Sequence, residues 1–302
     1  MDKARKQTDK LLNQMEKKIS KIYDQAYKDI SKSWNQFMAV HKPMVQDAYN
    51  KLQEALKNGT TQEIFDAKTY YERVLNNTIL QNKRYKAMTN ELAEKISHIN
   101  EIALDYVNGN MAKVYTTNYN AFGNEKIDGY SFSLTNEQAV KNLAKSDKAL
   151  LPTKQLNKNK DVKWNHKQIN SQMMQGILQG ESIPKLAKRL ENVMGMDKKS
   201  AIRNARTMTT AAENKGRQDS YEKAAEDGVI MGREWIATSD DRTRDWHSEL
   251  NGVIVGVDEP WENEYGEIMF PGDPDADPTN VYNCRCSIRA HVIGFKKWED
   301  EK

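Results

Sequence analysis

The two cysteines of this chain are separated by one residue, at Cys284 and Cys286 in the sequence NCRC. Thiolates and imidazoles are ligands that zinc prefers, and a structural zinc site usually has four of them. Cys284, Cys286 and His247 could supply three, with His291 or Asp240 as the fourth. A disulfide across one intervening residue would be strained, so we do not expect one.

The C-x-C spacing argues against a shared metal ion if the two cysteines lie on a strand. Residues i and i+2 share a face of a strand but stand further apart than two ligands of one metal prefer, unless the backbone turns. We therefore favour buried, metal-free thiols that pin a short strand to the loop of His247, with zinc as the alternative. On this interpretation the protein needs no cofactor.

The sequence SDDRTRDWH places Asp240 and Asp241 shortly before His247. A metal-dependent nuclease or hydrolase could use the two carboxylates to hold a divalent ion and the imidazole as a base. We favour a rigid turn in which the aspartates cap backbone amides and pair with arginine, because no second carboxylate cluster stands at metal-binding spacing. We therefore expect no catalytic residues, and the hydrolase remains the alternative.

The charge is distributed unevenly along the chain. Residues 141–217 carry 17 Lys and Arg against 6 Asp and Glu, a net charge of +11, whereas residues 218–302 carry 9 against 20, a net charge of −11. A basic segment can neutralise phosphates without reading base sequence, or it can neutralise the acidic segment across an internal interface. The candidate DNA-binding residues are Lys185, Lys188, Arg189, Lys198, Lys199, Arg203 and Arg206.

Apolar residues recur every three or four positions from Leu11 to Phe37, which predicts a long helix. We expect Pro43 to interrupt it and a further helix to end at NGTT, residues 58–61. A second long helix is expected over residues 62–107. Together these elements predict an elongated helical N-terminal arm over residues 1–120.

The residue composition changes twice along the rest of the chain. Residues 108–131 are rich in Asn, Gly, Thr and Tyr, which is typical of a connector, and a basic helical middle domain is expected over 121–228. From 229 to 302, the short β-prone runs VIMGREWIAT, NGVIVGV, GEIMF and CSIRAHVIGF predict a small strand-and-loop module. The predicted fold class is mainly α with a small α+β C-terminal module.

Four segments follow one another over about ninety residues: AIRNARTMTTAAEN, WIATSDDRTRDWHSELNG, FPGDP and NCRC. In this order and spacing, over roughly residues 170–290, the chain resembles the head morphogenesis or minor head proteins of tailed bacteriophages, the Mu F-like group. The family usually has Glu after its Arg-Thr pair, where this chain has Met208. The matching residues are Ala205, Arg206, Thr207, Trp235, Asp240, Asp241, Arg242, Arg244, His247, Asn251, Gly252, Pro271, Gly272, Asn283, Cys284, Arg285 and Cys286.

The resemblance implies a structural virion protein that is not an enzyme. Its implied place is the capsid interior near the portal vertex, after synthesis in the host cytoplasm. The implied partners are the portal protein, capsid or scaffold proteins and nonspecific double-stranded DNA, and the implied work is to assist DNA packaging or ejection. Some members carry a toxin or transferase domain after this module, and we expect none in this chain. We also expect no membrane partner, because no run of apolar residues is long enough to span a bilayer.

Overall fold

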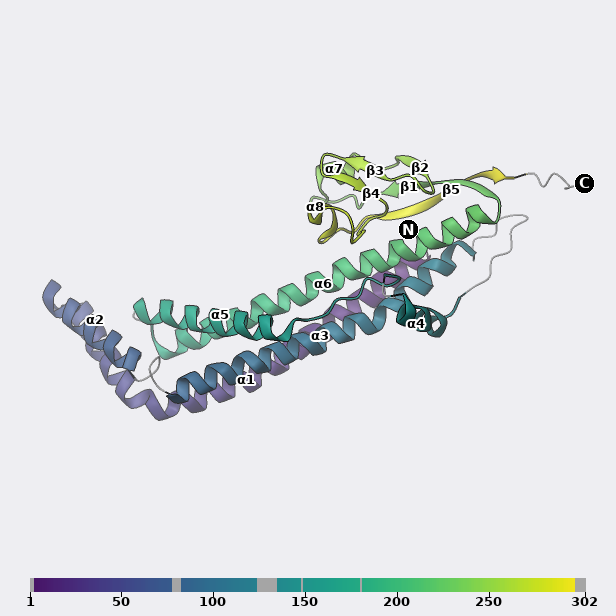
Figure 1. The fold of residues 1–302 in the computed structure, drawn as a ribbon. Coiled ribbons are helices and arrows are strands. Elements are labelled where there is room, and N and C mark those ends of the chain that lie inside the picture. The colour runs from purple at the N-terminus through teal and green to yellow at the C-terminus, as the bar shows by residue number, and fades with distance from the viewer. Residues whose placement is uncertain (1–2, 78–82, 124–134, 148, 180, 297–302) are drawn as a thin grey trace, which may run out of the picture. The chain divides into compact units, whose positions relative to one another are not determined.

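The computed structural model describes residues 3–77, 83–123, 135–147, 149–179 and 181–296 (Figure 1). Contacts between residues divide the chain into two compact units, each built from separate stretches of sequence. Unit 1 comprises Met1–Lys17, Leu104–Gln155 and Ile202–Lys302, and unit 2 comprises Lys18–Ala103 and Leu156–Ala201. This division differs from the three consecutive domains expected from the sequence.

The N-terminal part of the chain is helical, as expected, but its helices begin and end at other residues. Helix α1 spans Lys3–Asn58, so Pro43 lies inside it and does not end it. Proline removes one hydrogen bond and tends to kink a helix. Here Trp34, Val45 and Ala48 are all buried, so packing on both sides of the proline holds the helix together.

The prediction of a single helix over residues 62–107 was also wrong. Helix α2 spans Thr61–Leu75 and helix α3 spans Lys83–Gly123. Thr60 and Glu63 form a capping box that begins α2. Residues 108–123, expected to belong to a connector, continue α3, because Met111, Ala112 and neighbouring apolar side chains are buried and packing overrides the low helix propensity of Asn and Gly. The remainder of that connector, 124–131, lies outside the described residues.

The middle of the chain forms helices α4 (Glu137–Ser146), α5 (Lys158–Leu178) and α6 (Ile183–Glu226). The breaks fall near Pro152 and before Pro184, which stands in the first turn of α6, where proline is tolerated. The core of unit 2 forms where α1, α2, α3, α5 and α6 bury Trp34, Tyr71, Leu92, Ile169 and Leu190.

The C-terminal module contains a three-stranded antiparallel sheet in the order β2-β1-β5, formed by β1 (Val229–Ile236), β2 (Ile254–Gly256) and β5 (Ser287–Phe295). Strands β3 (Trp261–Asn263) and β4 (Gly266–Ile268) form a separate antiparallel pair, and two short helices, α7 (Asp245–Ser248) and α8 (Pro278–Val281), lie in the loops (Figure 1). The sequence did not predict β3. The module shares one core with α6, whose Tyr221 and Ala224 pack with Trp235 and Ile288.

The predicted fold class is confirmed: long helices make up the N-terminal part, and a small strand module follows them. Within the described residues, every helix is too short or too polar to cross a membrane.

Candidate metal centre

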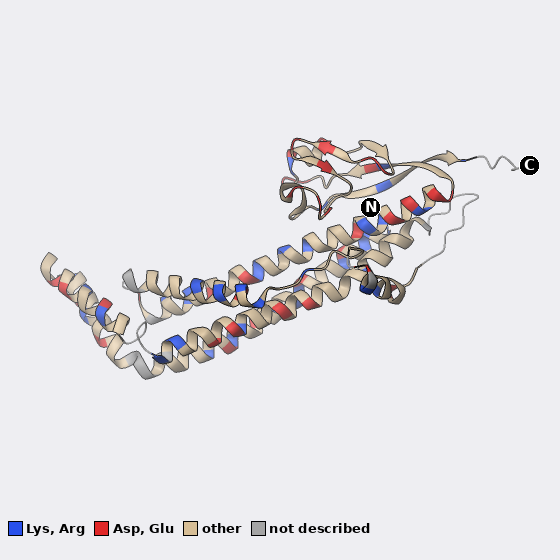
Figure 2. Cartoon of the chain, in the orientation of Figure 1, with Lys and Arg blue, Asp and Glu red and all other residues tan. Residues whose placement is uncertain are grey.

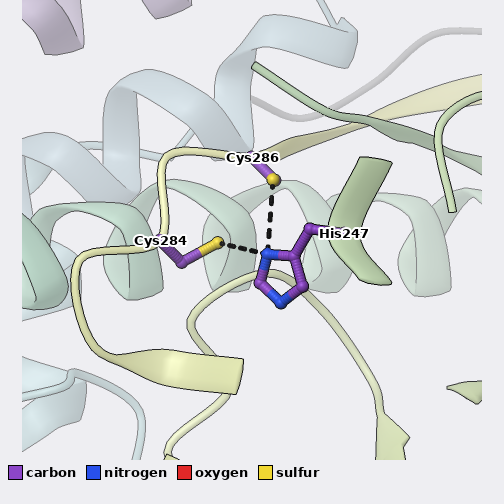
Figure 3. Close-up of side chains that lie close together, drawn as sticks. All are labelled: His247, Cys284 and Cys286. Carbon is purple, nitrogen blue, oxygen red and sulfur yellow. Dashed lines mark hydrogen bonds between the residues drawn. The ribbon is translucent and has the colours of Figure 1, made fainter. Parts of the chain in front are cut away.

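Three side chains from two segments converge inside the C-terminal module (Figure 3). The Sγ atoms of Cys284 and Cys286 each lie 3.6 Å from Nδ1 of His247. Their ligand atoms all lie within 4.8 Å of one another, and each side chain is at most 3% exposed. Neither His291 nor Asp240, the fourth ligands considered from the sequence, belongs to this group among the described residues.

The orientation of the His247 ring is fixed by its other nitrogen. Nε2 lies 3.3 Å from Oδ1 of Asn280, and Nδ2 of Asn263 donates to the same oxygen over 3.0 Å. Because that amide oxygen can only accept, the proton of the neutral imidazole is assigned to Nε2. The lone pair of Nδ1 therefore faces the two sulfur atoms. The ring of Trp235 packs against the imidazole at an interplanar angle of 74°, with centroids 5.4 Å apart.

The cysteines lie in a turn that precedes β5, and not on a strand as expected. Asn283 adopts a φ of 58°, a left-handed conformation that asparagine tolerates better than most residues. Its N–H donates to Oγ1 of Thr207 over 3.2 Å, and the N–H of Cys284 donates to the carbonyl of Val281 over 3.2 Å. This backbone turn brings both sulfur atoms to one imidazole nitrogen.

The carbonyl groups of the NCRC turn are held by side chains from other segments. Thr210 of α6 donates to the carbonyl of Cys284 over 2.7 Å, and Asn214 of α6 donates to that of Cys286 over 3.2 Å. Arg5 and Thr238 both donate to the carbonyl of Arg285, over 2.6 and 2.7 Å. Three successive carbonyls therefore have partners, which fixes the turn before any ligand binds.

The Pro-Gly loop of the motif docks on the same face of α6. Asn214 donates to the carbonyl of Pro271 over 3.0 Å and accepts from the N–H of Ile288 over 3.1 Å. Gly272 has a φ of 83°, and a Cβ atom there would lie 2.9 Å from the backbone nitrogen of Ala211. Glycine is required at this position because both the backbone conformation and the close approach exclude a side chain.

The SDDRTRDWH segment forms a turn tied to the NCRC turn. Asp240 accepts two hydrogen bonds from the guanidinium of Arg285, which holds the pKa of that carboxyl well below its usual range. Asp240 also accepts from the N–H of Arg242 over 3.1 Å, and Arg244 donates to the carbonyl of Tyr282. Asp241 is exposed. Within the described part of the chain, the aspartates form no metal-binding group with His247, so the geometry does not assemble the hydrolase site considered from the sequence.

The remaining motif residues position β1 and its neighbours. Trp235 on β1 is fully buried, and its ring meets that of Trp261 at 5.4 Å. Asn251 accepts the N–H of Ala237 over 2.9 Å, and Gly252, with a φ of 82°, donates its N–H to the carbonyl of Trp235 over 2.8 Å.

A buried arginine that the sequence analysis did not single out braces the module. Arg233 on β1 has no exposed surface, and burial lowers its pKa to about 10, so the group remains charged at neutral pH. Its guanidinium donates to the carbonyls of Gly256, Met269 and Glu259 and to Oε1 of Gln218. The sequence pattern could have revealed it, because Arg233 alternates with the apolar residues Met231 and Trp235 and so lies on the same inward face of the strand.

The sequence analysis also missed a polar stripe on α6, formed by Thr207, Thr210 and Asn214. Positions three and seven residues apart share one face of a helix, so these polar side chains form a stripe in an otherwise buried part of α6. Buried polar groups need partners, and the backbone of the NCRC turn supplies them. Asn280, which orients His247, gave no comparable signal.

The two thiols have different acidities. A hydrogen bond from the Cys284 thiol lowers the pKa of the Cys286 thiol, and the imidazole of His247 lowers it further. The pKa of the Cys284 thiol is raised by its interaction with Cys286 and by burial. The arrangement thus favours thiolate character at Cys286, and the thiolate is the form of cysteine that binds metal ions.

Several of the candidate DNA-binding residues are engaged by acidic side chains. Arg189 pairs with Glu181, and Lys188 with Glu191, each at 2.6 Å. Lys198 pairs with Asp24 at 2.8 Å, and Arg206 pairs with Glu16 at 2.6 Å. Figure 2 shows Lys and Arg interspersed with Asp and Glu along the long helices. The structure therefore does not gather the seven residues into one unpaired basic surface.

The chain is similar to several known proteins. Residues 167–289 match the profile of the family described as Phage Mu protein F like protein. The minor head protein GP7 of Bacillus phage SPP1 is 34% identical over 115 residues, which are 38% of this chain and 37% of that relative. The NAD(+)–arginine ADP-ribosyltransferase EFV of Enterococcus faecalis is 31% identical over 131 residues, which are 42% of this chain and 26% of that relative.

A third relative, the uncharacterized protein YqbB of Bacillus subtilis, is 24% identical over 145 residues, which are 45% of this chain and 47% of that relative. This chain therefore spans less than half the length of each of these relatives. No solved structure gives a significant match. The family match includes α6, the loop of His247 and the NCRC turn, and it confirms the resemblance drawn from the motifs: residues 167–289 are similar to the phage Mu F-like family.

Proposed function

We propose that this chain is a minor head protein, a structural component that acts in phage head morphogenesis. The observation that carries the proposal is the family match over residues 167–289, supported by the 34% identity to a phage minor head protein. The matched region contains the NCRC turn, its anchors on α6 and the Asp240–Arg285 pair. These contacts build a rigid module, which suits a protein that works by holding its place in an assembly.

The finer part of the proposal concerns location and partners. We infer that the chain docks on the portal inside the procapsid, beside capsid or scaffold proteins, and assists the packaging or ejection of DNA. It would be made in the host cytoplasm and end in the virion near the portal vertex. The resemblance to minor head proteins supports this interpretation, and the basic residues exposed on α6, such as Lys185 and Lys199, support a weak, nonspecific contact with duplex DNA.

An enzymatic role has less support in this chain. The hydrolase interpretation needs Asp240, Asp241 and His247 around one metal ion, whereas Asp240 pairs with Arg285 and His247 faces the cysteines. The match to the ADP-ribosyltransferase spans about a quarter of that protein, so its activity does not extend to this chain on that ground.

Procapsids from a phage that encodes this chain provide the test. Particles made with and without the portal gene would be purified, and this chain would be quantified in each by mass spectrometry. We expect it in portal-containing procapsids and not in portal-less ones. Its presence in both kinds of particle would contradict portal docking and leave the head role standing. Its absence from both would contradict the proposal as a whole.

A further inference from the structure

We propose that Cys284, Cys286 and His247 bind a zinc ion through the two Sγ atoms and Nδ1. This inference does not depend on the proposed function. The sequence alone favoured metal-free thiols, because a C-x-C pair on a strand spreads its side chains. The structure removes that objection, since the pair lies in the turn before β5 and both sulfur atoms reach one nitrogen.

The distances fit a tetrahedral ion. Zinc lies about 2.3 Å from thiolate sulfur and about 2.0 Å from imidazole nitrogen, which places sulfur and nitrogen about 3.5 Å apart around one tetrahedral ion. Both sulfur atoms lie 3.6 Å from Nδ1, and all three ligand atoms lie within 4.8 Å of one another. Two sulfur ligands of one tetrahedral zinc ion lie about 3.8 Å apart, so the two thiols would approach each other by at most about 1 Å to accept the ion.

The hydrogen-bonding capacity of the three groups favours a cation between them. Nδ1 has one lone pair, because Nε2 carries the proton that faces Asn280, so at most one thiol can donate to it. Among the three groups, a second thiol proton can be accepted only by the other sulfur atom, which is a weak acceptor. A cation at the centre would instead be shared by all three ligand atoms.

The surrounding contacts resemble those that orient known metal ligands. A histidine that binds a metal usually donates its other ring N–H to an oxygen acceptor, which fixes the tautomer and the direction of the ring. Asn280 supplies that acceptor, and Asn263 holds the amide in place over 3.0 Å. The carbonyls of both cysteines are held by Thr210 and Asn214 of α6. The site is therefore preorganised on both sides.

The donor set selects zinc among the common metal ions. Two thiolates and an imidazole are too soft for magnesium or calcium, which prefer oxygen ligands. The described His, Cys, Asp and Glu side chains contribute no fourth member to the group. We assign the fourth position to a ligand from outside this group, such as water. The ion would join α7 to the NCRC turn, two segments 37 residues apart in the sequence.

Metal analysis of the full-length, untagged protein tests the inference. The protein would be purified without chelator, dialysed and measured by elemental analysis, and we expect about one zinc per chain. Chelator-treated wild-type protein would then be titrated with Co²⁺, which gives thiolate charge-transfer bands and intense visible absorption in a tetrahedral site with sulfur ligands. These bands should appear and saturate at an equimolar ratio.

Matched variants separate binding from folding. Cys286→Ser and His247→Gln should lose the zinc and the cobalt bands, whereas His291→Gln, which changes an exposed histidine on β5, should retain both. Since a ligand variant can also fail to fold, the cobalt titration of wild-type protein decides the matter independently. Wild-type protein that retains no zinc after dialysis and gives no thiolate–cobalt bands would overturn the inference.

Discussion

The hydroxyl of Thr210 donates to the carbonyl of Cys284 over 2.7 Å, and this bond joins the middle of α6 to the turn that carries both cysteines. Thr210 is 7% exposed and Cys284 is 2% exposed, so water does not replace either partner. The Arg-Thr helix and the NCRC turn, 74 residues apart in the sequence, are therefore parts of one arrangement.

Replacing Thr210 with valine keeps the shape of the side chain and removes the hydroxyl, which leaves a buried carbonyl without its partner. We expect the free energy of unfolding to fall by about 1–3 kcal/mol. Thr209→Val is the matched control, because the hydroxyl of Thr209 donates to the carbonyl of Ala205 within the same helix. Urea denaturation of both variants measures the difference. Equal decreases in the two variants would show that the hydrogen bond to Cys284 does not stabilise the module.

Replacing Arg233 with leucine should destabilise the module much more. The change leaves the carbonyls of Met269 and Glu259 without their donor in a buried region, and it removes a guanidinium that lies 4.6 Å from the ring centroid of Trp261. Removing one partner from such a buried charged network costs about 3 kcal/mol or more.

Arg289→Leu is the control for Arg233→Leu, since Arg289 lies on β5 and its side chain is 65% exposed, where an ion pair with Glu234 contributes little. Thermal unfolding followed by circular dichroism compares the two variants with the wild type. A decrease in stability for Arg233→Leu no larger than that for Arg289→Leu would contradict a bracing role of the buried guanidinium.

The elements of the C-terminal module were largely predictable, because alternating apolar residues and turn residues report on local conformation. The run VIMGREWI became β1, and the run from Ser287 to Phe295 became β5. The boundaries of the long helices were less predictable. Pro43 and the Asn- and Gly-rich end of α3 disfavour helix locally, yet packing of buried residues such as Trp34 and Tyr115 keeps both segments helical.

The candidate site was predictable in its members and not in its geometry. Residue types alone brought Cys284, Cys286 and His247 together as a set. Whether they could share an ion depended on the positive φ of Asn283, which residue types alone do not reveal. The side chains that hold the turn come from Thr210 and Asn214, more than seventy residues earlier, and such long-range pairings are not encoded in any local pattern.

The DNA contact proposed for α6 predicts an effect of exposed lysines. Lys198 and Arg206 pair with Asp24 and Glu16, so replacing them would also release an acidic side chain. Lys185→Gln combined with Lys199→Gln avoids this complication. We expect weaker binding to duplex DNA and a weaker dependence of that binding on salt. The slope of the logarithm of the binding constant against the logarithm of the salt concentration should become shallower by about 0.9 for each phosphate that the protein no longer neutralises.

The control for these lysines is Lys28→Gln combined with Lys32→Gln, which removes the same charge from exposed positions on α1. Fluorescence anisotropy over a series of salt concentrations measures both double variants. If the two lower the affinity and the slope equally, only overall charge matters, and the proposed surface on α6 is wrong.

Asp197 of α6 predicts a dependence of stability on pH. The residue is 6% exposed, and burial, followed by the charge of Asp161, raises the pKa of its carboxyl from 3.8 to about 7. The folded state therefore binds this proton more tightly than the unfolded state does. The resulting stability is fully present below pH 3.8 and is lost as the pH rises through about 7. We expect the contribution of Asp197 to the free energy of unfolding to fall on going from pH 5 to pH 8.

Asp197→Asn should remove that part of the pH dependence, because the amide stays neutral at every pH. At about 1.4 kcal/mol per pKa unit, the gain over wild type at pH 8 should approach about 4 kcal/mol, with a smaller difference at pH 5. Asp29→Asn, at an exposed position on α1, is the control and should leave the profile unchanged. Urea denaturation at several pH values measures all three proteins. A variant whose stability relative to wild type is the same at pH 5 and pH 8 would show that Asp197 is already ionised at pH 5, and that the neighbouring carboxyls of Asp197 and Asp161 tolerate two charges.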